Sequence, residues 1–313
     1  MSVPVSGIVG AGILPADTFN IMSLIAVFVL ISLGLHFTFG MLNIVNLAHG
    51  EFILIGAYTA FELQESTGSV VLGMVAAPFV TALVGIVIER GILRFLYDRP
   101  LDTLIATFGI ALVIRQIVQL IYTANPRTLT DPIGGSFVLA GMNVPLWRMT
   151  LVIASIVLVV LVALLLDRTR FGLHARATVR NPTLAETMGI RTGWMRTRLF
   201  AIGSGLAGIA GALIAPIATL NPSFGTLFLV NSFLVVILGG RGSLTGLVAA
   251  AAVLGGSLAI LQFWISTVYA QIIVLIIAIV GVRLRVSFLG GGGGFGRLWG
   301  RRRRGRARKS RRW

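Results

Sequence analysis

Cysteine is missing from this chain, and lysine occurs once, at Lys309. The absence of cysteine excludes a disulfide framework and a thiolate metal site. The residues before Lys309 do not form a GxxxxGK[ST] phosphate loop, so the chain has no ATP-hydrolysing loop of that kind. Its histidines and acids show no metal-ligand spacing, and no serine lies in a nucleophile elbow. We therefore expect no enzyme activity, and no metal or cofactor bound by this chain.

Charged residues are also scarce. Asp, Glu, Lys and Arg make up 12% of the 313 residues, whereas an ordinary soluble domain carries about 25%. Hydrophobic residues make up 56%, and the apolar runs leave no soluble block large enough to fold alone. Residues 1–17 lack the positively charged start of a cleavable signal peptide, so the first apolar run is expected to stay in the mature protein.

Apolar runs of membrane-spanning length recur along the chain. A bilayer core of roughly 30 Å needs about 20 helical residues, because unpaired backbone groups are costly in lipid. We expect an all-α integral membrane protein, a polytopic bundle of about 8–10 transmembrane helices that forms one transmembrane domain over residues 1–289. The candidate runs are 18–39, 42–62, 70–89, 101–122, 149–166, 198–219, the short 226–239, 243–263 and 267–283.

The distribution of arginine predicts the orientation. Basic residues gather around 90–100, in 167–198 and in the tail, and even numbers of runs separate these regions. The positive-inside rule therefore places all three on the cytoplasmic side. The C-terminus is expected inside and the N-terminus outside, and the loop 123–148, with its Pro and Gly turn signals, is expected on the opposite face.

The last 24 residues differ from the rest. Residues 290–294 are five consecutive glycines, and from Arg283 onward there are twelve basic residues and no acid. We interpret 290–313 as a flexible basic cytoplasmic tail that contacts anionic lipids, since arginines beside a membrane attract them. Nucleic acid is not an expected partner, because the tail has no folded module and no interleaved aromatic platform.

Polar residues interrupt the apolar sequence between Leu33 and Tyr58. They include Asn43, Asn46, His49 and Glu51, and Gly50 lies between the last two. A carboxylate at membrane depth costs at least ~2.5 kcal/mol, so Glu51 is not expected to face lipid. We predict a helix interrupted near 40–51 that lines a pathway. The alternative is a cytoplasmic turn whose polar groups are in water.

Arg115 is the other charge inside an apolar run. It either pairs with a carboxylate such as Glu51 or extends toward the external loop, and the sequence favours neither.

A second informative region lies in the basic stretch 167–198. Pro182 is suited to begin a short helix and Gly189 to end it, which leaves Leu184, Ala185 and Met188 as a small apolar face. This pattern predicts a docking element. A solvated basic loop is the alternative, and it explains the arginines but not the helix-sized insert.

A third region, LGGRGSLTG at 238–246, is rich in glycine and predicts a tight turn between two runs. Two interrupted segments in one membrane protein are typical of an inverted repeat with a site near the midplane. We therefore treat 236–246 together with 40–51 as the candidate halves of such a repeat.

These motifs resemble one family. NLAHGEF at 46–52 followed by GAY at 56–58 resembles the NFAHGE segment of the branched-chain amino acid type ABC permeases. LIATFG at 104–109 is similar to the family's LIATIG-type segment, and 236–246 to its LGGxGSLxG turn. Arg241 adds a charge to that turn, and Thr245 stands where the family commonly has proline. The resemblance covers residues 20–285.

The resemblance implies a permease subunit of an ABC importer for branched-chain amino acids or related small solutes such as amides and urea. ATP would be used by two cytoplasmic ATP-binding subunits, and an extracytoplasmic solute-binding protein and a second permease subunit, identical or homologous, would complete the importer in the bacterial inner membrane. The implied pathway residues are Asn43, Asn46, His49, Gly50 and Glu51. The implied ATPase-coupling residues are Arg176, Ala177, Ala185, Glu186, Met188 and Gly189.

Two other functions remain open from the residues alone. In an ion-coupled secondary transporter or channel, Glu51 and Arg115 would handle ions or protons, and interrupted helices suit that function equally well. A membrane scaffold would instead depend on its basic tail.

Overall fold

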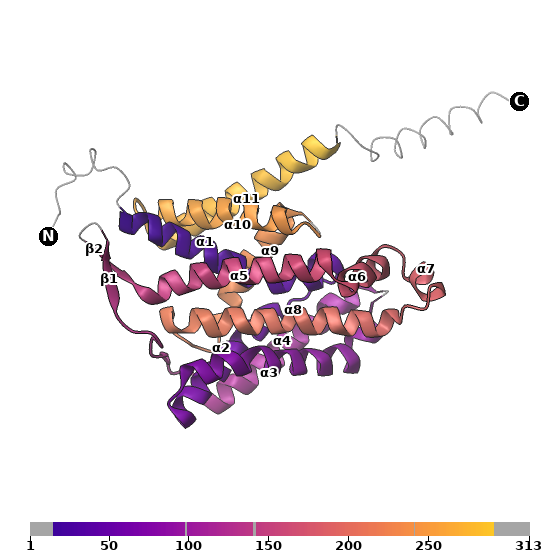
Figure 1. Ribbon diagram of the computed structural model, residues 1–313, viewed down its shortest axis with the longest axis horizontal. Coiled ribbons are helices and arrows are strands. Elements are labelled where there is room, and N and C mark those ends of the chain that lie inside the picture. The colour runs from indigo at the N-terminus through magenta and orange to yellow at the C-terminus, as the bar shows by residue number, and fades with distance from the viewer. Residues whose placement is uncertain (1–14, 98, 140–141, 241, 291–313) are drawn as a thin grey trace, which may run out of the picture.

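The computed structural model describes residues 15–97, 99–139, 142–240 and 242–290 as a bundle of parallel and antiparallel helices with one β-hairpin (Figure 1). The elements are α1 Pro15–Leu35, the π-helix η2 His36–Met41, α2 His49–Thr67, α3 Val70–Gly91, η3 Leu93–Phe95, α4 Pro100–Tyr122, β1 Ser136–Leu139, β2 Met142–Pro145, α5 Leu146–Arg168, α6 Arg170–Arg180, α7 Pro182–Thr187, α8 Thr192–Ile214, η4 Ala215–Ile217, α9 Phe224–Gly239, α10 Leu244–Leu261 and α11 Thr267–Gly290.

Helices of membrane-spanning length confirm the predicted class. In the described ranges, seven helical stretches are long and apolar enough to cross a bilayer, those of α1, α3, α4, α5, α8, α10 and α11. The shorter α9 and the more polar α2 complete the nine runs seen in the sequence. The protein is an all-α polytopic membrane protein.

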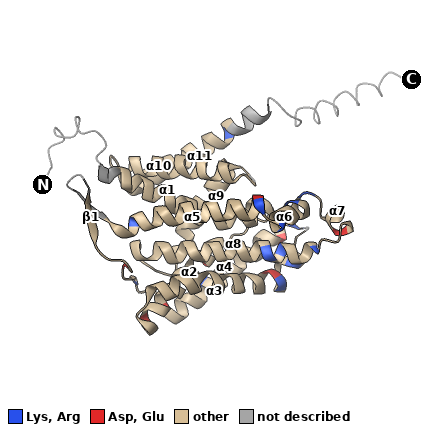
Figure 2. Ribbon diagram, in the orientation of Figure 1, with Lys and Arg blue, Asp and Glu red and all other residues tan. Residues whose placement is uncertain are grey.

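The bundle has two distinct ends (Figures 1 and 2). The hairpin end carries β1 and β2, which pair antiparallel with Ser136 opposite Pro145. The basic end carries α6 and α7, and most described arginines gather there (Figure 2). α1 begins at the hairpin end, where Asn20 Oδ1 accepts a hydrogen bond from Arg148 at 2.6 Å. The described helix ends therefore agree with the parity that the positive-inside rule predicted.

Burial divides the helices into an inner and an outer set. The apolar window of α1 is 78% buried, whereas those of α4 and α11 are each 17% buried. Large apolar side chains such as Phe79 on α3 and Ile105 on α4 are exposed. Because lipid is as apolar as these side chains, the outer helices are suited to face it. The interior is built around α1, α2 and α8.

The chain contains an inverted repeat. α1 runs from the hairpin end toward the basic end, and after a break α2 runs back toward the hairpin end. α8 runs from the basic end toward the hairpin end, and after a break at 218–223 α9 runs back toward the basic end. α3 packs against α8 as α10 packs against α1. Each of these partners begins with a serine N-cap, in which Ser69 Oγ accepts from Leu72 N and Ser243 Oγ from Gly246 N.

The repeat corrects one sequence expectation. The counterpart of the break at 42–48 is 218–223, not 236–246. The glycine-rich stretch 236–246 is the predicted turn, in which Gly240 and Gly242 have φ of 84° and 73°, but it corresponds to the turn between α2 and α3. A tight turn between two helices and a break within a helical pair look alike in sequence, because turns and breaks both use glycine and small polar residues.

Candidate functional site

The connection between α1 and α2 is the most unusual segment of the bundle. α1 widens into the π-helix η2, whose residues are all buried, and π-helical turns are frequent at functional sites. Residues 42–48 then fold back along α1, with Asn43 at a φ of 59°. This return brings His49 beside Ile31, so α2 begins inside the bundle and not at its basic end. The predicted interruption near 40–51 is confirmed, and the expected helical run 42–62 starts later, at His49.

Local hydrogen bonds hold this folded-back segment. Asn46 Oδ1 accepts from Ala48 N at 3.1 Å, and His49 Nε2 lies 2.8 Å from Ile31 O. Thr107 on α4 contacts the same segment, because its hydroxyl accepts from Leu47 N at 3.1 Å and lies 3.3 Å from Val45 O and 3.0 Å from Leu104 O. Asn46 and Thr107 thereby supply partners that the non-helical backbone needs away from water, and His49 ties the start of α2 to α1.

Glu51 and Arg115 form an ion pair inside the bundle. Glu51 Oε1 and Arg115 Nη2 are 2.5 Å apart, and the Glu51 side chain is almost completely buried. Glu51 also lies in the first turn of α2, where the helix dipole favours a negative charge. The pairing decides between the two roles that the sequence left open for Arg115, and it explains how both charges are accommodated at membrane depth.

Glycines bring the two broken halves into contact. A Cβ on Gly50 would overlap the carbonyl of Gly225, and a Cβ on Gly225 would overlap that of Gly50. The first turns of α2 and α9 therefore cross backbone to backbone. Gly34 of α1 and Gly203 of α8 make a second reciprocal contact of this kind. Small residues at such crossings are what close helix packing in membranes requires.

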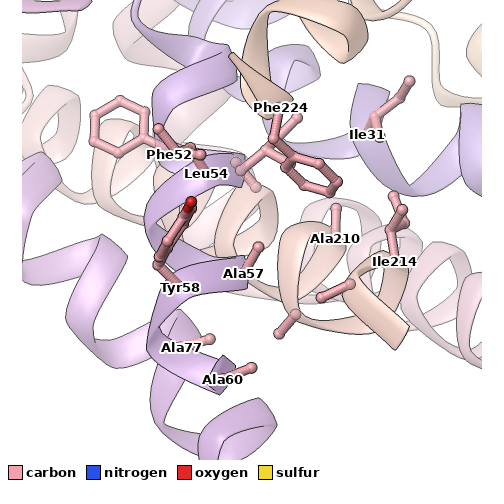
Figure 3. Packing of buried hydrophobic residues seen from close by; sticks show 14 of the residues in the cluster. Ile31, Phe52, Leu54, Ala57, Tyr58, Ala60, Ala77, Ala210, Ile214 and Phe224 are labelled. Atoms are coloured by element: carbon pink, nitrogen blue, oxygen red, sulfur yellow. The ribbon is translucent and has the colours of Figure 1, made fainter. Parts of the chain in front are cut away.

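An apolar core surrounds this crossing (Figure 3). Phe52 and Leu54 of α2, Phe224 of α9, Ile31 of α1 and Ala210 of α8 belong to one buried cluster. The cluster joins both halves of the repeat, so a shift of either broken helix has to repack its partner.

The five pathway candidates divide into two groups. Asn46, His49, Gly50 and Glu51 are buried within the chain at the α2–α9 crossing, whereas Asn43 lines a small cavity of about 130 Å³ at the basic end. Their contribution to a pathway stays a prediction. Sequence reasoning assigned no role to Thr107 or to Ser232, whose hydroxyl lies 2.6 Å from Phe228 O and 3.2 Å from Ile31 O. The signal available for both was a small polar residue within an apolar run.

The basic loop folds as two helices rather than one. α7 begins where Pro182 predicts it, with Asn181 Oδ1 accepting from Leu184 N at 3.0 Å, and Gly189 follows it with a φ of 81°. α6 was not predicted. Its N-cap is Thr169, whose hydroxyl accepts from Gly172 N at 3.3 Å.

The predicted apolar face of α7 needs a correction. Leu184 and Met188 are 57% and 72% exposed, but Ala185 is 2% exposed and faces the chain's own interior. Glu186 is exposed and accepts a hydrogen bond from the Thr192 hydroxyl at the start of α8. The expected coupling residues Arg176 and Ala177 lie on α6 instead, where Arg176 Nη1 bonds Leu166 O and, at 3.2 Å, Asp167 Oδ1.

A buried acid connects this loop region to α3. Glu89 accepts hydrogen bonds from the Tyr97 hydroxyl at 2.6 Å and from the Thr197 hydroxyl at 2.7 Å. Burial, and then the hydrogen bond to Glu89, raise the pKa of Tyr97 above its ordinary value. The end of α3, the following turn and the first turns of α8 are thereby tied together.

Comparison with known proteins agrees with these features. The family model described as "Branched-chain amino acid transport system / permease component" matches residues 18–282. The probable branched-chain amino acid transport permease protein LivH of Methanocaldococcus jannaschii is 29% identical over 80% of this chain and 84% of that protein. The high-affinity branched-chain amino acid permeases LivH of Escherichia coli K12 and BraD of Pseudomonas aeruginosa are 27% and 29% identical, over 82% and 74% of this chain and 88% and 79% of their own lengths.

No solved structure matches the chain at the level of significance applied to these relatives. The match to the family model includes the α1–α2 break, the glycine crossing and α7. With seven helices of membrane-spanning length in the described ranges, an inverted repeat and a family match over most of its length, the chain belongs to the branched-chain amino acid transport permease family.

Proposed function

We propose that this chain is the membrane-spanning permease subunit of an ABC importer that translocates branched-chain amino acids or related small polar solutes, such as amides and urea. The observation that carries the proposal is α7, a short capped helix at the basic end that presents Leu184 and Met188 to its surroundings. Exposed apolar side chains on a polar loop mark interaction sites with partner proteins, and methionine is enriched at such interfaces. The partner is a cytoplasmic ATP-binding subunit.

A short series of contacts connects α7 to the membrane helices, so a movement of α7 is passed on to them. α7 is joined to α8 through Glu186 and Thr192. α8 is joined to α3 through Thr197 and Glu89, and it crosses α1 at the Gly34–Gly203 contact. A displacement of α7 by closing ATPase subunits would thus shift α8 against the broken helices as a rigid body. ATP is hydrolysed by those subunits and not by this chain.

The remaining parts of the importer follow from the orientation. The basic end, including the end of α11, faces the cytoplasm of a bacterial cell, and the hairpin end receives solute from an extracytoplasmic binding protein. A second permease subunit, identical or homologous, completes the pathway, to which Asn43 and the α2–α9 crossing contribute. The proposed lipid contacts of the tail concern residues 291–313, which lie outside the described residues.

Substitutions on α7 test this proposal. Met188→Asp, introduced into the tagged full chain in its native host, is expected to reduce co-purification of a P-loop ATPase by about tenfold, because an acid replaces an apolar anchor. Thr183→Asp is the matched control, since it adds the same charge on an exposed position of the same helix. Glu186 is a poorer choice because it also holds α8.

Three outcomes would contradict the proposal. The first is recovery of the unaltered chain without an ATPase. The second is equal ATPase recovery with Met188→Asp and wild type. The third is transport by the isolated chain under an ion gradient, which would favour an ion-coupled transporter built on the Glu51–Arg115 pair.

A further inference from the structure

A mixed polar and apolar cavity near the basic end lies outside the α2–α9 crossing. Its volume is about 490 Å³, which lies within the 300–1,000 Å³ range of small-molecule sites. Its walls come from η2, the end of α5, α6 and the start of α10. These four elements belong to both halves of the repeat and to the basic loop, so a molecule bound here would join them.

One wall holds a buried polar atom without a partner. His36 is 1% exposed and lines the cavity, and its Nδ1 has no hydrogen bond among the described residues. An unpaired buried polar group costs about 1–3 kcal/mol, and a ligand group would remove that cost. A Cβ on Gly40 would lie 3.2 Å from His36 Nδ1 and 3.5 Å from Gly242 N, so Gly40 keeps this corner open.

Charges of both signs line the same cavity. Arg180 is exposed at the end of α6, and Arg176, one turn before it, is paired with Asp167 of α5 at 3.2 Å. The N-terminus of α10 also opens here, and its partial positive charge favours an anion. Arg180, the α10 N-terminus and His36 therefore suit a carboxylate, whereas the Asp167 carboxylate suits an ammonium group.

The rest of the lining is apolar. Met41 of η2, Leu166 of α5, Val179 of α6 and Leu244 of α10 contribute aliphatic surface. The lining thus has a basic part, an acidic part and an apolar part. A small molecule that contacts all three carries a carboxylate, an ammonium group and an aliphatic side chain. A free phosphate or a lipid phosphate uses only the basic part.

We propose that this cavity is a second amino-acid site, which binds a free aliphatic α-amino acid from the basic side of the protein. The carboxylate lies toward Arg180 and the α10 N-terminus, the ammonium group toward Asp167, and the side chain against Met41 and Leu166. The inference rests on the proposed function for the expectation that the ligand is also the transported solute.

Binding to the purified full chain tests the site without any partner subunit. Equilibrium dialysis of the chain in nanodiscs against radiolabelled L-leucine is expected to show saturable binding with a Kd near or below ~1 mM. 4-Methylpentanoate lacks the ammonium group and 3-methylbutylamine lacks the carboxylate, so each is expected to compete at least tenfold more weakly.

Two variants and one control locate the binding. Arg180→Ala is expected to weaken leucine binding about tenfold, and Ala163→Leu, which fills space at the α5 wall, to weaken it similarly. Arg170→Ala removes the same charge from an exposed position of α6 that is not in the cavity wall, and it is expected to bind leucine as wild type does. Thermal unfolding of each variant verifies that it is folded.

Several results would overturn the inference. They are absence of leucine binding up to ~10 mM, unchanged binding in Arg180→Ala, or displacement of leucine by inorganic phosphate as readily as by leucine itself. Failure to recover an ATPase would instead contradict the proposed function and leave leucine binding to be judged alone. Recovery of the ATPase without leucine binding would refute only this second site.

Discussion

The Glu51–Arg115 pair carries the clearest energetic consequence at the residue scale. The two residues are 64 positions apart, and each lowers the cost of the other's charge inside the bundle. Sequence reasoning predicted that Glu51 avoids lipid, because that follows from the cost of one buried carboxylate. It could not choose the partner of Arg115, because the contact depends on how α4 packs against α2.

Removal of one partner is therefore expected to be worse than removal of both. Arg115→Met leaves Glu51 buried and unpaired, at a cost of about 3–5 kcal/mol in unfolding free energy. The double variant Glu51→Gln with Arg115→Met is expected to recover at least half of that loss. Thermal unfolding of the four proteins of this double-mutant cycle in the same detergent measures the coupling. A double variant as unstable as the sum of the single variants would show that the pair is not coupled.

At the scale of single elements, local signals were the reliable ones. Pro182, Gly189 and the N-cap Asn181 act within one or two turns, and α7 was predicted correctly from the first two. The inward face of Ala185 was missed because burial depends on how α7 packs against the rest of the chain. The hairpin at 136–145 was missed because the prolines and glycines just before it, at 126, 132, 134 and 135, are equally typical of an irregular loop.

The contact between the turn after α3 and the start of α8 gives a second prediction. Tyr97→Phe removes one of the two hydroxyls that bond Glu89, and it is expected to lower the free energy of unfolding by about 1.5–3 kcal/mol. Tyr269→Phe is the control, because Tyr269 is exposed on α11.

The same tyrosine predicts a pH dependence. Since the pKa of Tyr97 is higher in the folded chain than its unfolded value of about 10, its contribution is fully present below about pH 10. Above that pH the unfolded tyrosine ionises first, and stability falls. Unfolding measured from about pH 8 to pH 11 should show a shallower decline in Tyr97→Phe than in wild type, and parallel declines would count against this assignment.

For the whole molecule, the inverted repeat and the positive-inside pattern place opposite ends on opposite sides. The sequence predicted a repeat from 40–51 and 236–246, but the second of these is a turn between two helices. The true counterpart, 218–223, was missed because its Asn221-Pro222 is equally typical of an ordinary turn. Packing of α3 on α8 and of α10 on α1 identifies the true counterparts.

The absence of native cysteine makes this orientation easy to measure. Single cysteines at Ser136 in the hairpin and Thr183 in α7 both lie at exposed positions. In intact cells, an impermeant maleimide is expected to label Ser136→Cys and to label Thr183→Cys only after the membrane is opened. The reverse pattern would mean that the basic end faces outward.

The central claim is that ATP bound by separate subunits drives solute through this chain. The most direct measurement is leucine uptake by proteoliposomes that contain the chain together with its co-purified ATPase and binding protein. The account predicts uptake that requires ATP on the side of the basic end and persists when ionophores collapse all ion gradients. Uptake by the chain alone under an ion gradient, with no requirement for ATP, would contradict it.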